Sequence, residues 1–448
     1  STKRASSASY AASPHTLRGG GVFVCLALMS EGVSTQPQAV PDGAHTPANV
    51  IVGVAGGIAA YKACHLIRNF TERGDSVRVI PTENALRFVG AATFEALSGN
   101  PVDTSVFTRV DEVQHVRLGQ EADLIVVAPA TADLIARVAA GRADDLLTST
   151  ILVATCPVVL APAMHTEMWR NPATRANVAT LRERGITVLE PAHGRLTGKD
   201  SGPGRLPEPD VIAELARTVA ATGPFERTLE GKRVLISAGG TQENIDPVRF
   251  IGNRSSGKQG FALGDIAAQR GAAVTIVAGD TDELEPPAGA EVVRVRSTRD
   301  LEREMNERAA DADVIIMAAA VADFRPESEA GTKLKKGTSD DALSTIHLVE
   351  NPDVLKGLVA KRDAGETDAT IIGFAAETDH ELEHGRAKLA RKGADMLMVN
   401  SVSGGGVFGQ DRNRGWLLAA GGGEEEIPDG TKHEVAARIW DAAERLSR

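Results

Sequence analysis

Two stretches of the chain repeat one pattern, an apolar strand followed by an amphipathic helix. Residues 49–55 (NVIVGVA) form a continuous apolar run, as does a strand buried on both faces of a parallel sheet. Gly56–Gly57 then opens a predicted helix that ends near Gly74, a C′ glycine, and residues 76–80 (SVRVI) predict the return strand. The apolar stripe of this helix comprises Ala60, Ala63, Cys64, Ile67 and Phe70. The segment therefore predicts a βαβ unit.

The second copy begins at residues 233–238 (RVLISA), which lead into Gly239–Gly240. A helix with Phe261, Leu263, Ile266 and Ala267 on its apolar side follows, and residues 273–279 (AVTIVAG) return as a strand. A further internal similarity pairs 121–134 (EADLIVVAPATADL) with 311–324 (DADVIIMAAAVADF), each a buried strand ending in a loop of small residues.

Other apolar runs predict strands at 186–190, 369–375, 394–400 and 415–420. The whole pattern predicts an α/β protein with two doubly wound, mainly parallel-sheet Rossmann-like domains. In such sheets, ligands bind outside the carboxyl ends of the strands.

The expected boundaries follow the loss of periodicity. Residues 1–46, rich in Ser, Ala, Gly and Pro, are expected to be a disordered leader. Met29 is interpreted as an internal start codon, so residues 1–28 are expected to be encoded upstream of the start. The first domain is expected at 47–222, the linker at 223–231 and the second domain at 232–448. No apolar run reaches the roughly 18 residues of a membrane span, so no membrane partner is expected.

Composition narrows the class of protein further. The 448 residues carry a net charge of −11, which argues against a nucleic-acid partner, since that would require a basic face. Cys25, Cys64 and Cys156 form no CxxC pair and are too few for a disulfide framework. They indicate a reducing, cytoplasmic location.

The loop Gly56–Gly57–Ile58 lies between a predicted strand and a helix start, where backbone N–H groups and the helix dipole favour a phosphate. A purely structural turn is the alternative. The loop lacks GxGxxG spacing and the acidic residue that would bind a ribose diol about 20 positions on. The pattern therefore favours a mononucleotide such as FMN over NAD.

Four segments of the first half, namely GGIAAYK (56–62), VQHVRLGQEAD around His115, APATADLIARVAAGRADDLL (128–147) and APAMHTEMW (161–169), resemble the flavin-dependent cysteine decarboxylases. The resemblance implies that FMN oxidises the thiol-bearing carbon, so that CO2 can leave, and then returns the electrons. It also implies that His115 is the catalytic base, whereas a lone histidine beside a helix is more often a solvated surface residue.

Further residues are assigned by the same resemblance. His165 stands where the family commonly has Asn, and it is kept with Met164 as substrate-binding, although Met164 can equally pack in the core. Thr197 is also assigned to substrate binding, at the position where the family often has a flap cysteine; it cannot supply a thiol, so the role of that cysteine is not transferred. The implied FMN contacts are Gly56, Gly57, Ile58, Thr82 and Thr131, and either threonine can instead cap a helix.

In the second half, residues 237–260 (SAGGTQENIDPVRFIGNRSSGKQG) resemble the phosphopantothenate–cysteine ligases. From about residue 49 onward, the chain thus resembles the bifunctional phosphopantothenoylcysteine decarboxylase/phosphopantothenate–cysteine ligase (CoaBC) family. Ser255, Ser256 and Gly257 precede a predicted helix and form either an anion-binding substrate site or a simple cap. The GxxxxGK[ST] spacing of a Walker A loop is absent.

The ligase resemblance implies a two-step reaction. The carboxylate of 4′-phosphopantothenate attacks the α-phosphate of CTP, giving an acyl-cytidylate and pyrophosphate. The amine of cysteine then displaces CMP to form the amide. Asn253 and Lys333 are the implied catalytic residues, and Mg2+ (or Mn2+) is expected to be held mainly by the phosphates, because no carboxylate cluster marks a metal site. The implied CTP site comprises Ala318, Ala319, Asp323, Lys333, Pro352, Asp353, Val354, Leu355, Phe374, Lys388 and Lys392.

The related proteins also imply a homo-oligomer, with trimeric contacts in the decarboxylase core and dimeric contacts in the ligase. Two alternatives stay open at this point. One is a flavin-binding regulatory subunit of a phosphatase whose decarboxylase site has decayed, in view of His165 and Thr197. The other is a nicotinamide-dependent dehydrogenase on two Rossmann-like folds.

Overall fold

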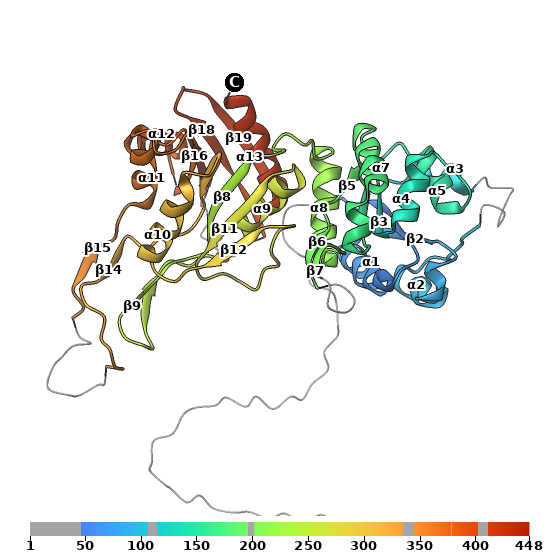
Figure 1. Ribbon diagram of the computed structural model, residues 1–448, viewed down its shortest axis with the longest axis horizontal. Helices are drawn as coiled ribbons and strands as arrows, with labels where there is room; N and C mark the ends of the chain where they lie inside the picture. Colours follow the sequence, from blue (N-terminus) through green and yellow to red (C-terminus); the bar gives the residue numbers. More distant parts are fainter. Residues whose placement is uncertain are drawn as a thin grey trace, which may run out of the picture. The chain divides into compact units, whose positions relative to one another are not determined.

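The computed structural model describes residues 46–105, 114–195, 201–334, 345–377, 379–401 and 411–447 (Figure 1). The predicted leader, apart from Thr46, lies outside these residues. Two large sheets dominate the structure, one before residue 190 and one after residue 232.

The first sheet has five parallel strands in the order β2-β1-β3-β4-β5. Their bounds are β1 Asn49–Val54, β2 Ser76–Pro81, β3 Leu124–Ala130, β4 Val158–Pro162 and β5 Thr187–Val188. All seven residues of β3 are buried, as expected of a central strand covered on both faces.

Helices cover both faces of this sheet. One face is packed by α1 (Ala63–Glu72), α2 (Ala91–Ser98) and α8 (Pro209–Thr222). The other is packed by α3 (Gln114–Glu121), α4 (Ala132–Ala139), α5 (Leu146–Val153) and α7 (Pro172–Glu183). Phe70 of α1 is fully buried, which contributes about 1.5–3 kcal/mol relative to an exposed side chain.

The second sheet has eight strands in the order β12-β11-β8-β13-β16-β17-β18-β19. The strands from β12 to β17 are parallel, and β18 and β19 are antiparallel. Their bounds are β8 Arg233–Ala238, β11 Ala273–Ala278, β12 Glu291–Arg294, β13 Val314–Met317, β16 Thr370–Glu377, β17 Met396–Ser401, β18 Arg412–Ala419 and β19 Glu424–Thr431.

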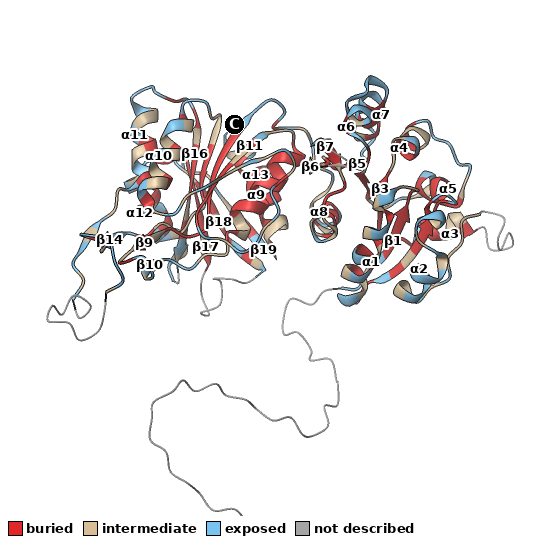
Figure 2. Cartoon of the chain, turned by 60° about the horizontal axis from the view of Figure 1, so that its bottom comes forward, coloured by how far each residue is buried: buried red, intermediate tan, exposed pale blue. Residues whose placement is uncertain are grey.

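The second sheet is also covered on both faces, and its strands are largely buried (Figure 2). Helices α9 (Lys258–Gln269) and α13 (Lys432–Leu446) pack on one face. Helices α10 (Thr298–Ala309), α11 (Val354–Asp363) and α12 (Glu381–Lys392) pack on the other. Two mainly parallel sheets with helices on both faces confirm the predicted α/β fold class.

Shorter elements complete the described chain. They are the helices η1 (Ile58–Lys62), η2 (Ala85–Arg87) and α6 (Thr166–Arg170), and the hairpins β6–β7 (Ala192–Arg195 with Ser201–Arg205), β9–β10 (Gln242–Asn244 with Phe250–Gly252) and β14–β15 (Phe324–Pro326 with Leu348–Glu350). Among the described residues, no helix has the length and apolar character needed to cross a bilayer.

Three local predictions need correction. The helix after Gly57 begins as the 3-10 turn η1, and α1 starts only at Ala63. The strand expected at 186–190 is two residues long. Strand β19 was not predicted, because its sequence, EEEIPDGT, has charges and a proline that are tolerated only on an edge strand.

Candidate active sites

The glycine loop of the first half lies directly after β1, at the carboxyl edge of the sheet. Gly57 is the N-cap of η1 and provides no side-chain cap, and Ile58 is 75% exposed. A Cβ at Gly57 would lie 3.8 Å from Cγ2 of Thr131, so the structure brings these two predicted residues together. An uncapped helix start beside a hydroxyl fits a phosphate group such as that of FMN.

Gly56 has a different role from its neighbour. A Cβ at this position would lie 2.5 Å from Cβ of Asn84, so the glycine lets the turn after β2 approach the loop. Thr82, in that turn, is buried, and its hydroxyl accepts a hydrogen bond from the N–H of Ala85 at 3.2 Å.

Thr131 is the N-cap of α4, and its hydroxyl accepts a hydrogen bond from the N–H of Leu134 at 3.3 Å. The helix-capping alternative is thus observed for this residue. A hydroxyl that accepts one bond still has a proton to donate, so capping does not compete with a flavin contact.

His115 lies in the first turn of α3. Its ring nitrogen Nδ1 is buried and has no hydrogen-bond partner among the residues that the structure describes, which is unusual for a buried polar atom. Among the described residues, no hydrogen bond or ion pair joins His115 to the Gly57 loop or to His165.

Met164 and His165 lie between β4 and α6. Met164 is 9% exposed and packs in the apolar core, whereas His165 is exposed at the N-cap of α6. The N–H of Met164 donates to the carbonyl of Gly204 at 3.0 Å, and the Thr166 hydroxyl donates to the carbonyl of Pro203 at 2.8 Å. Strand β7 is therefore bonded to the predicted substrate segment, while Thr197 lies outside the described residues.

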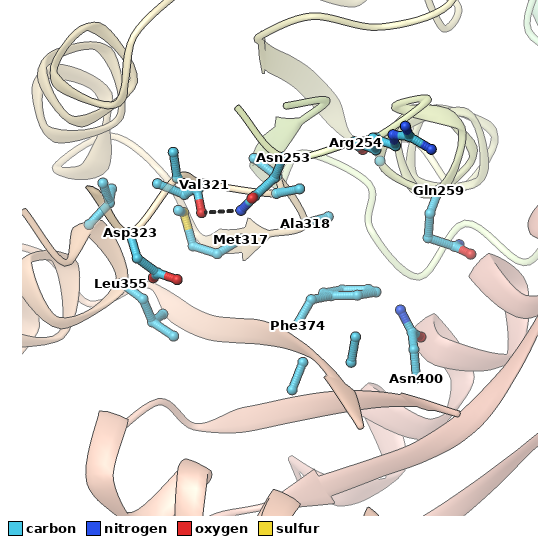
Figure 3. Close-up of a pocket in the computed structure, with 18 of the residues that line it drawn as sticks. Asn253, Arg254, Gln259, Met317, Ala318, Val321, Asp323, Leu355, Phe374 and Asn400 are labelled. Carbon is cyan, nitrogen blue, oxygen red and sulfur yellow. Dashed lines mark hydrogen bonds between the residues drawn. The ribbon is translucent and has the colours of Figure 1, made fainter. Parts of the chain in front are cut away.

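The second half contains a cavity of about 1110 Å³ at the carboxyl edge of its sheet (Figure 3). Every site residue predicted for this half except Lys333 lines it. These residues are Asn253, Ser255, Ser256, Gly257, Ala318, Ala319, Asp323, Pro352, Asp353, Val354, Leu355, Phe374, Lys388 and Lys392.

One wall of this cavity is the loop that follows β13, and polar side chains from neighbouring segments fix its backbone. The N–H of Ala319 donates to the Ser237 hydroxyl at 3.2 Å, and the N–H of Ala322 donates to the Thr241 hydroxyl at 2.9 Å. The Asn351 amide donates to the carbonyl of Ala322 at 2.9 Å. The wall is thus pre-organised before any ligand arrives.

Asn253 projects from the segment before α9 toward this wall. Its Nδ2 donates to the carbonyl of Val321 at 2.8 Å (Figure 3). That bond uses the amide nitrogen and fixes the side-chain plane, so the amide oxygen is held in one orientation at the cavity.

Of the two interpretations of Ser255, Ser256 and Gly257, the start of α9 does not show the simple serine cap. The helix begins at Lys258 and its N-cap is Gly257, which has a left-handed backbone (φ 75°) and no side-chain cap. The Ser255 hydroxyl accepts instead from the N–H of Gly257 at 3.3 Å. The first N–H groups of α9 therefore keep their capacity for an anion.

The cavity is electropositive although the whole protein is acidic. Its cationic residues are Arg254, Lys258, Lys388, Arg391, Lys392 and Lys432, against the carboxylates Asp323, Glu350 and Asp353. Burial alone would raise the pKa of Asp353, but its hydrogen bonds from Lys392 and from the N–H of Lys356 hold that pKa below its usual value. A concave site of this sign attracts polyphosphates and carboxylates.

Lys333 is exposed and is not part of the cavity lining. Its neighbour Leu334 is anchored, since the N–H of Leu334 donates to Oδ2 of Asp246 at 3.2 Å. Asp246 is buried and also accepts from the N–H groups of Val248 and Arg249. Burial opposes ionisation of Asp246, but these bonds together hold its pKa below the usual value. The structure thus fixes the start of the predicted lysine segment without placing Lys333 in the cavity.

Several cavity residues were not predicted from the sequence, among them Gln259, Asn400, Asn413 and Lys432. Asn400 carried a usable signal, because a polar residue at the carboxyl end of a buried strand faces the ligand edge of the sheet. Among the described residues, no group of three or more His, Cys, Asp or Glu side chains is arranged to hold a metal ion.

Two family models match different parts of the chain. Residues 41–220 match a family model described as Flavoprotein, and residues 229–446 match one described as DNA/pantothenate metabolism flavoprotein C-terminal domain. A Mycolicibacterium smegmatis protein named coenzyme A biosynthesis bifunctional protein CoaBC is 59% identical over 402 residues, covering 88% of this chain and 96% of the relative. The protein of the same name from Bacillus subtilis is 40% identical over 403 residues, covering 89% and 97%.

Solved structures resemble parts of the chain. The crystal structure of the C-terminal domain of a CoaBC protein is 36% identical, with a TM-score of 0.42, covering 50% of this chain and 98% of that one. The crystal structure of the FMN-dependent cysteine decarboxylase SpaF is 33% identical, with a TM-score of 0.34, covering 39% and 98%.

Proposed function

The chain belongs to the CoaBC family of bifunctional coenzyme A biosynthesis proteins, and we propose the following division of its two activities. The second half ligates 4′-phosphopantothenate to cysteine by way of an acyl-cytidylate made from CTP. The first half decarboxylates the 4′-phosphopantothenoylcysteine so formed, with FMN as cofactor, to 4′-phosphopantetheine. The observation that carries the proposal is the single cavity that collects residues from segments as distant as Asn253 and Lys392.

In the ligase reaction, a carboxylate must approach a triphosphate although both are anionic. We assign Lys388 and Lys392, on one side of α12, to the triphosphate, together with Mg2+ or Mn2+ held mainly by phosphate oxygens. The loop of Ala318, Ala319 and Asp323 and the Phe374 ring are assigned to the rest of CTP, together with the start of α11 at Pro352, Asp353, Val354 and Leu355.

Asn253 is assigned to the second step, in which the cysteine amine displaces CMP. With Nδ2 committed to the Val321 carbonyl, the amide oxygen is available to accept a hydrogen bond from the attacking amine and so to orient it. Lys333 is assigned to charge stabilisation on the triphosphate or the acyl intermediate. For that role it must enter the cavity from the segment anchored at Asp246.

In the decarboxylase half, Gly57, Ile58 and Thr131 would hold the FMN phosphate at the start of η1. When bound, the flavin supplies a reversible two-electron oxidation of the substrate carbon that bears sulfur. His115 is assigned as the base, through an imidazole nitrogen that can take up a proton. The exposed His165 is assigned to the substrate carboxylate, with Met164 shaping the segment from beneath.

The domain boundaries are proposed at 47–222 and 232–448, with 223–231 as linker. We further propose a cytoplasmic homo-oligomer with trimeric contacts in the decarboxylase core and dimeric contacts in the ligase. The alternative of a phosphatase regulatory subunit is not favoured, because relatives that match nearly their whole length carry the bifunctional biosynthetic name. A dehydrogenase would bind NAD, and the visible absorption of bound flavin would distinguish it.

The decisive experiment supplies the pure protein with 4′-phosphopantothenate, cysteine, CTP and Mg2+ and follows 4′-phosphopantetheine. His115→Asn should accumulate phosphopantothenoylcysteine with pyrophosphate release intact, whereas Lys333→Gln should fail to ligate yet decarboxylate preformed phosphopantothenoylcysteine. Loss of both activities in either variant would contradict separate sites. Near-normal ligation by Lys333→Gln would show that the lysine is wrongly assigned.

A further inference from the structure

One side of the ligase cavity is lined by residues that the proposed reaction has not used. Gln259 and Asn400 lie across the cavity from Asp323 and Leu355 (Figure 3). The Asn413 amide donates to Oε1 of Gln259 at 3.2 Å and to Oδ1 of Asn400 at 3.0 Å. These amides form a connected polar surface from α9, β17 and β18.

Lys432 lies beside this surface, at the first position of α13. Its backbone carbonyl accepts a hydrogen bond from Nε2 of Gln259 at 3.2 Å, which ties the start of α13 to the start of α9. The helices run in the same direction, since the Trp440 indole donates to the carbonyl of Leu263 one to two turns further along both. Two helix N-termini, each with a partial positive charge, therefore lie at this side of the cavity.

The Lys432 ammonium makes no hydrogen bond or ion pair among the described residues. Its neighbour Lys258 differs, because that side chain is paired with Asp411 at 2.6 Å. Burial, and then repulsion from Lys258, lower the pKa of Lys432 to about 8 against the opposing attraction of Asp411. A half-buried cation without a partner is stabilised when an anion binds next to it.

The position of this lysine limits the anion that it can meet. The lysines assigned to the triphosphate, Lys388 and Lys392, come from α12 on the opposite face of the sheet from α13. A cavity of about 1110 Å³ also exceeds the roughly 300–1,000 Å³ that a single small ligand takes. There is room for a second substrate, with an anionic group at the Lys432 side.

We propose that Lys432 binds the terminal phosphate monoester of the acid substrate and thereby selects the phosphorylated acid over its unphosphorylated form. This inference rests on the proposed ligase function. The acid then spans the cavity, with its carboxylate near Asn253 and its phosphate between Lys432 and the start of α9.

The test compares Lys432→Met with wild type in the CTP-dependent release of pyrophosphate, using the full chain. KM is measured for 4′-phosphopantothenate, and Ki for pantothenate as a competitor. Removing a charge-assisted hydrogen bond should raise that KM about 10–100-fold, while the Ki for pantothenate and the KM for CTP change less than about threefold. Lys432→Arg should restore most of the lost affinity, since it keeps the charge.

Lys361→Met is the matched control, because Lys361 is a helix lysine of α11 that pairs with Glu366 and does not line the cavity. The two KM values and the Ki of this variant should stay at their wild-type values. If Lys432→Met weakened the binding of 4′-phosphopantothenate and of pantothenate equally, the role of Lys432 would be structural and the inference would be overturned. An unchanged KM for 4′-phosphopantothenate would overturn it as well. If Lys432→Met does not fold, Lys432→Gln is measured under the same criteria. Failure of the wild-type protein to release pyrophosphate with 4′-phosphopantothenate would instead reject the ligase function itself.

Discussion

Gly240→Ala tests whether the ligase depends on the placement of Asn253. Gly240 follows β8 and is fixed by two backbone hydrogen bonds to Asp280: its N–H donates to the Asp280 carbonyl at 2.9 Å, and its carbonyl accepts from the Asp280 N–H at 2.8 Å. A Cβ at this position would lie 2.4 Å from the backbone oxygen of Asn253. The clash is with backbone, so rotating a side chain cannot relieve it.

The size of the effect follows from that distance. Ordinary contacts of a Cβ begin at 3.4 Å, so the Asn253 segment must retreat by roughly 1 Å. A displacement of about 1 Å in a positioning group can reduce a rate about 100-fold. Because Asn253 is assigned to the second step, amide formation should fall by that factor while pyrophosphate release continues and the acyl-cytidylate accumulates.

The assay is a single turnover with CTP and 4′-phosphopantothenate, quenched and analysed for pyrophosphate, acyl-cytidylate and amide. Continued pyrophosphate release by the same variant, which uses the same cavity, reports that the second half is folded. Gly357→Ala on α11 is the matched control, because a Cβ there meets no atom within 4 Å. Amide formation within about threefold of wild type in Gly240→Ala would refute the reasoning, since 1 Å of displacement should cost far more.

Three further predictions concern other parts of the second half. Asp246→Asn weakens the anchor at the start of the Lys333 segment, so kcat for ligation should fall about tenfold, with the KM for CTP little changed; a changed CTP affinity with normal kcat would contradict this role. The KM for 4′-phosphopantothenate should rise as the pH increases above about 8, because the Lys432 ammonium of the free protein then loses its proton and with it the charge that binds the phosphate. The charged groups that face Lys432 are Asp411 and Lys258. In Lys432→Arg the rise in KM should be absent. Ser297→Ala removes the capping box of α10 and should lower the free energy of unfolding by about 1 kcal/mol, measured by urea denaturation, with ligation at 25 °C unchanged.

The sequence by itself determined the fold class and most of the ligase cavity. Buried parallel strands require long apolar runs, so residues 49–55 and 233–238 identified the first strand of each sheet. The residues that follow the carboxyl ends of parallel strands lie at the same edge of the sheet, however the helices pack against it. The loop at Ala318 and the ring of Phe374 were assigned to one site by the family resemblance, and both line the observed cavity.

Only the tertiary structure decided features that depend on neighbours distant in sequence. Strand β19 is stable because it pairs with β18 at the sheet edge, a context that its own charged residues do not reveal. Lys432 resembles any helix lysine until α13 packs beside α9 and half-buries its ammonium without an ion pair to any described carboxylate. Conversely, Lys333 matched a motif but lies outside the cavity lining, because a motif specifies residue types and not the position of the segment that carries them.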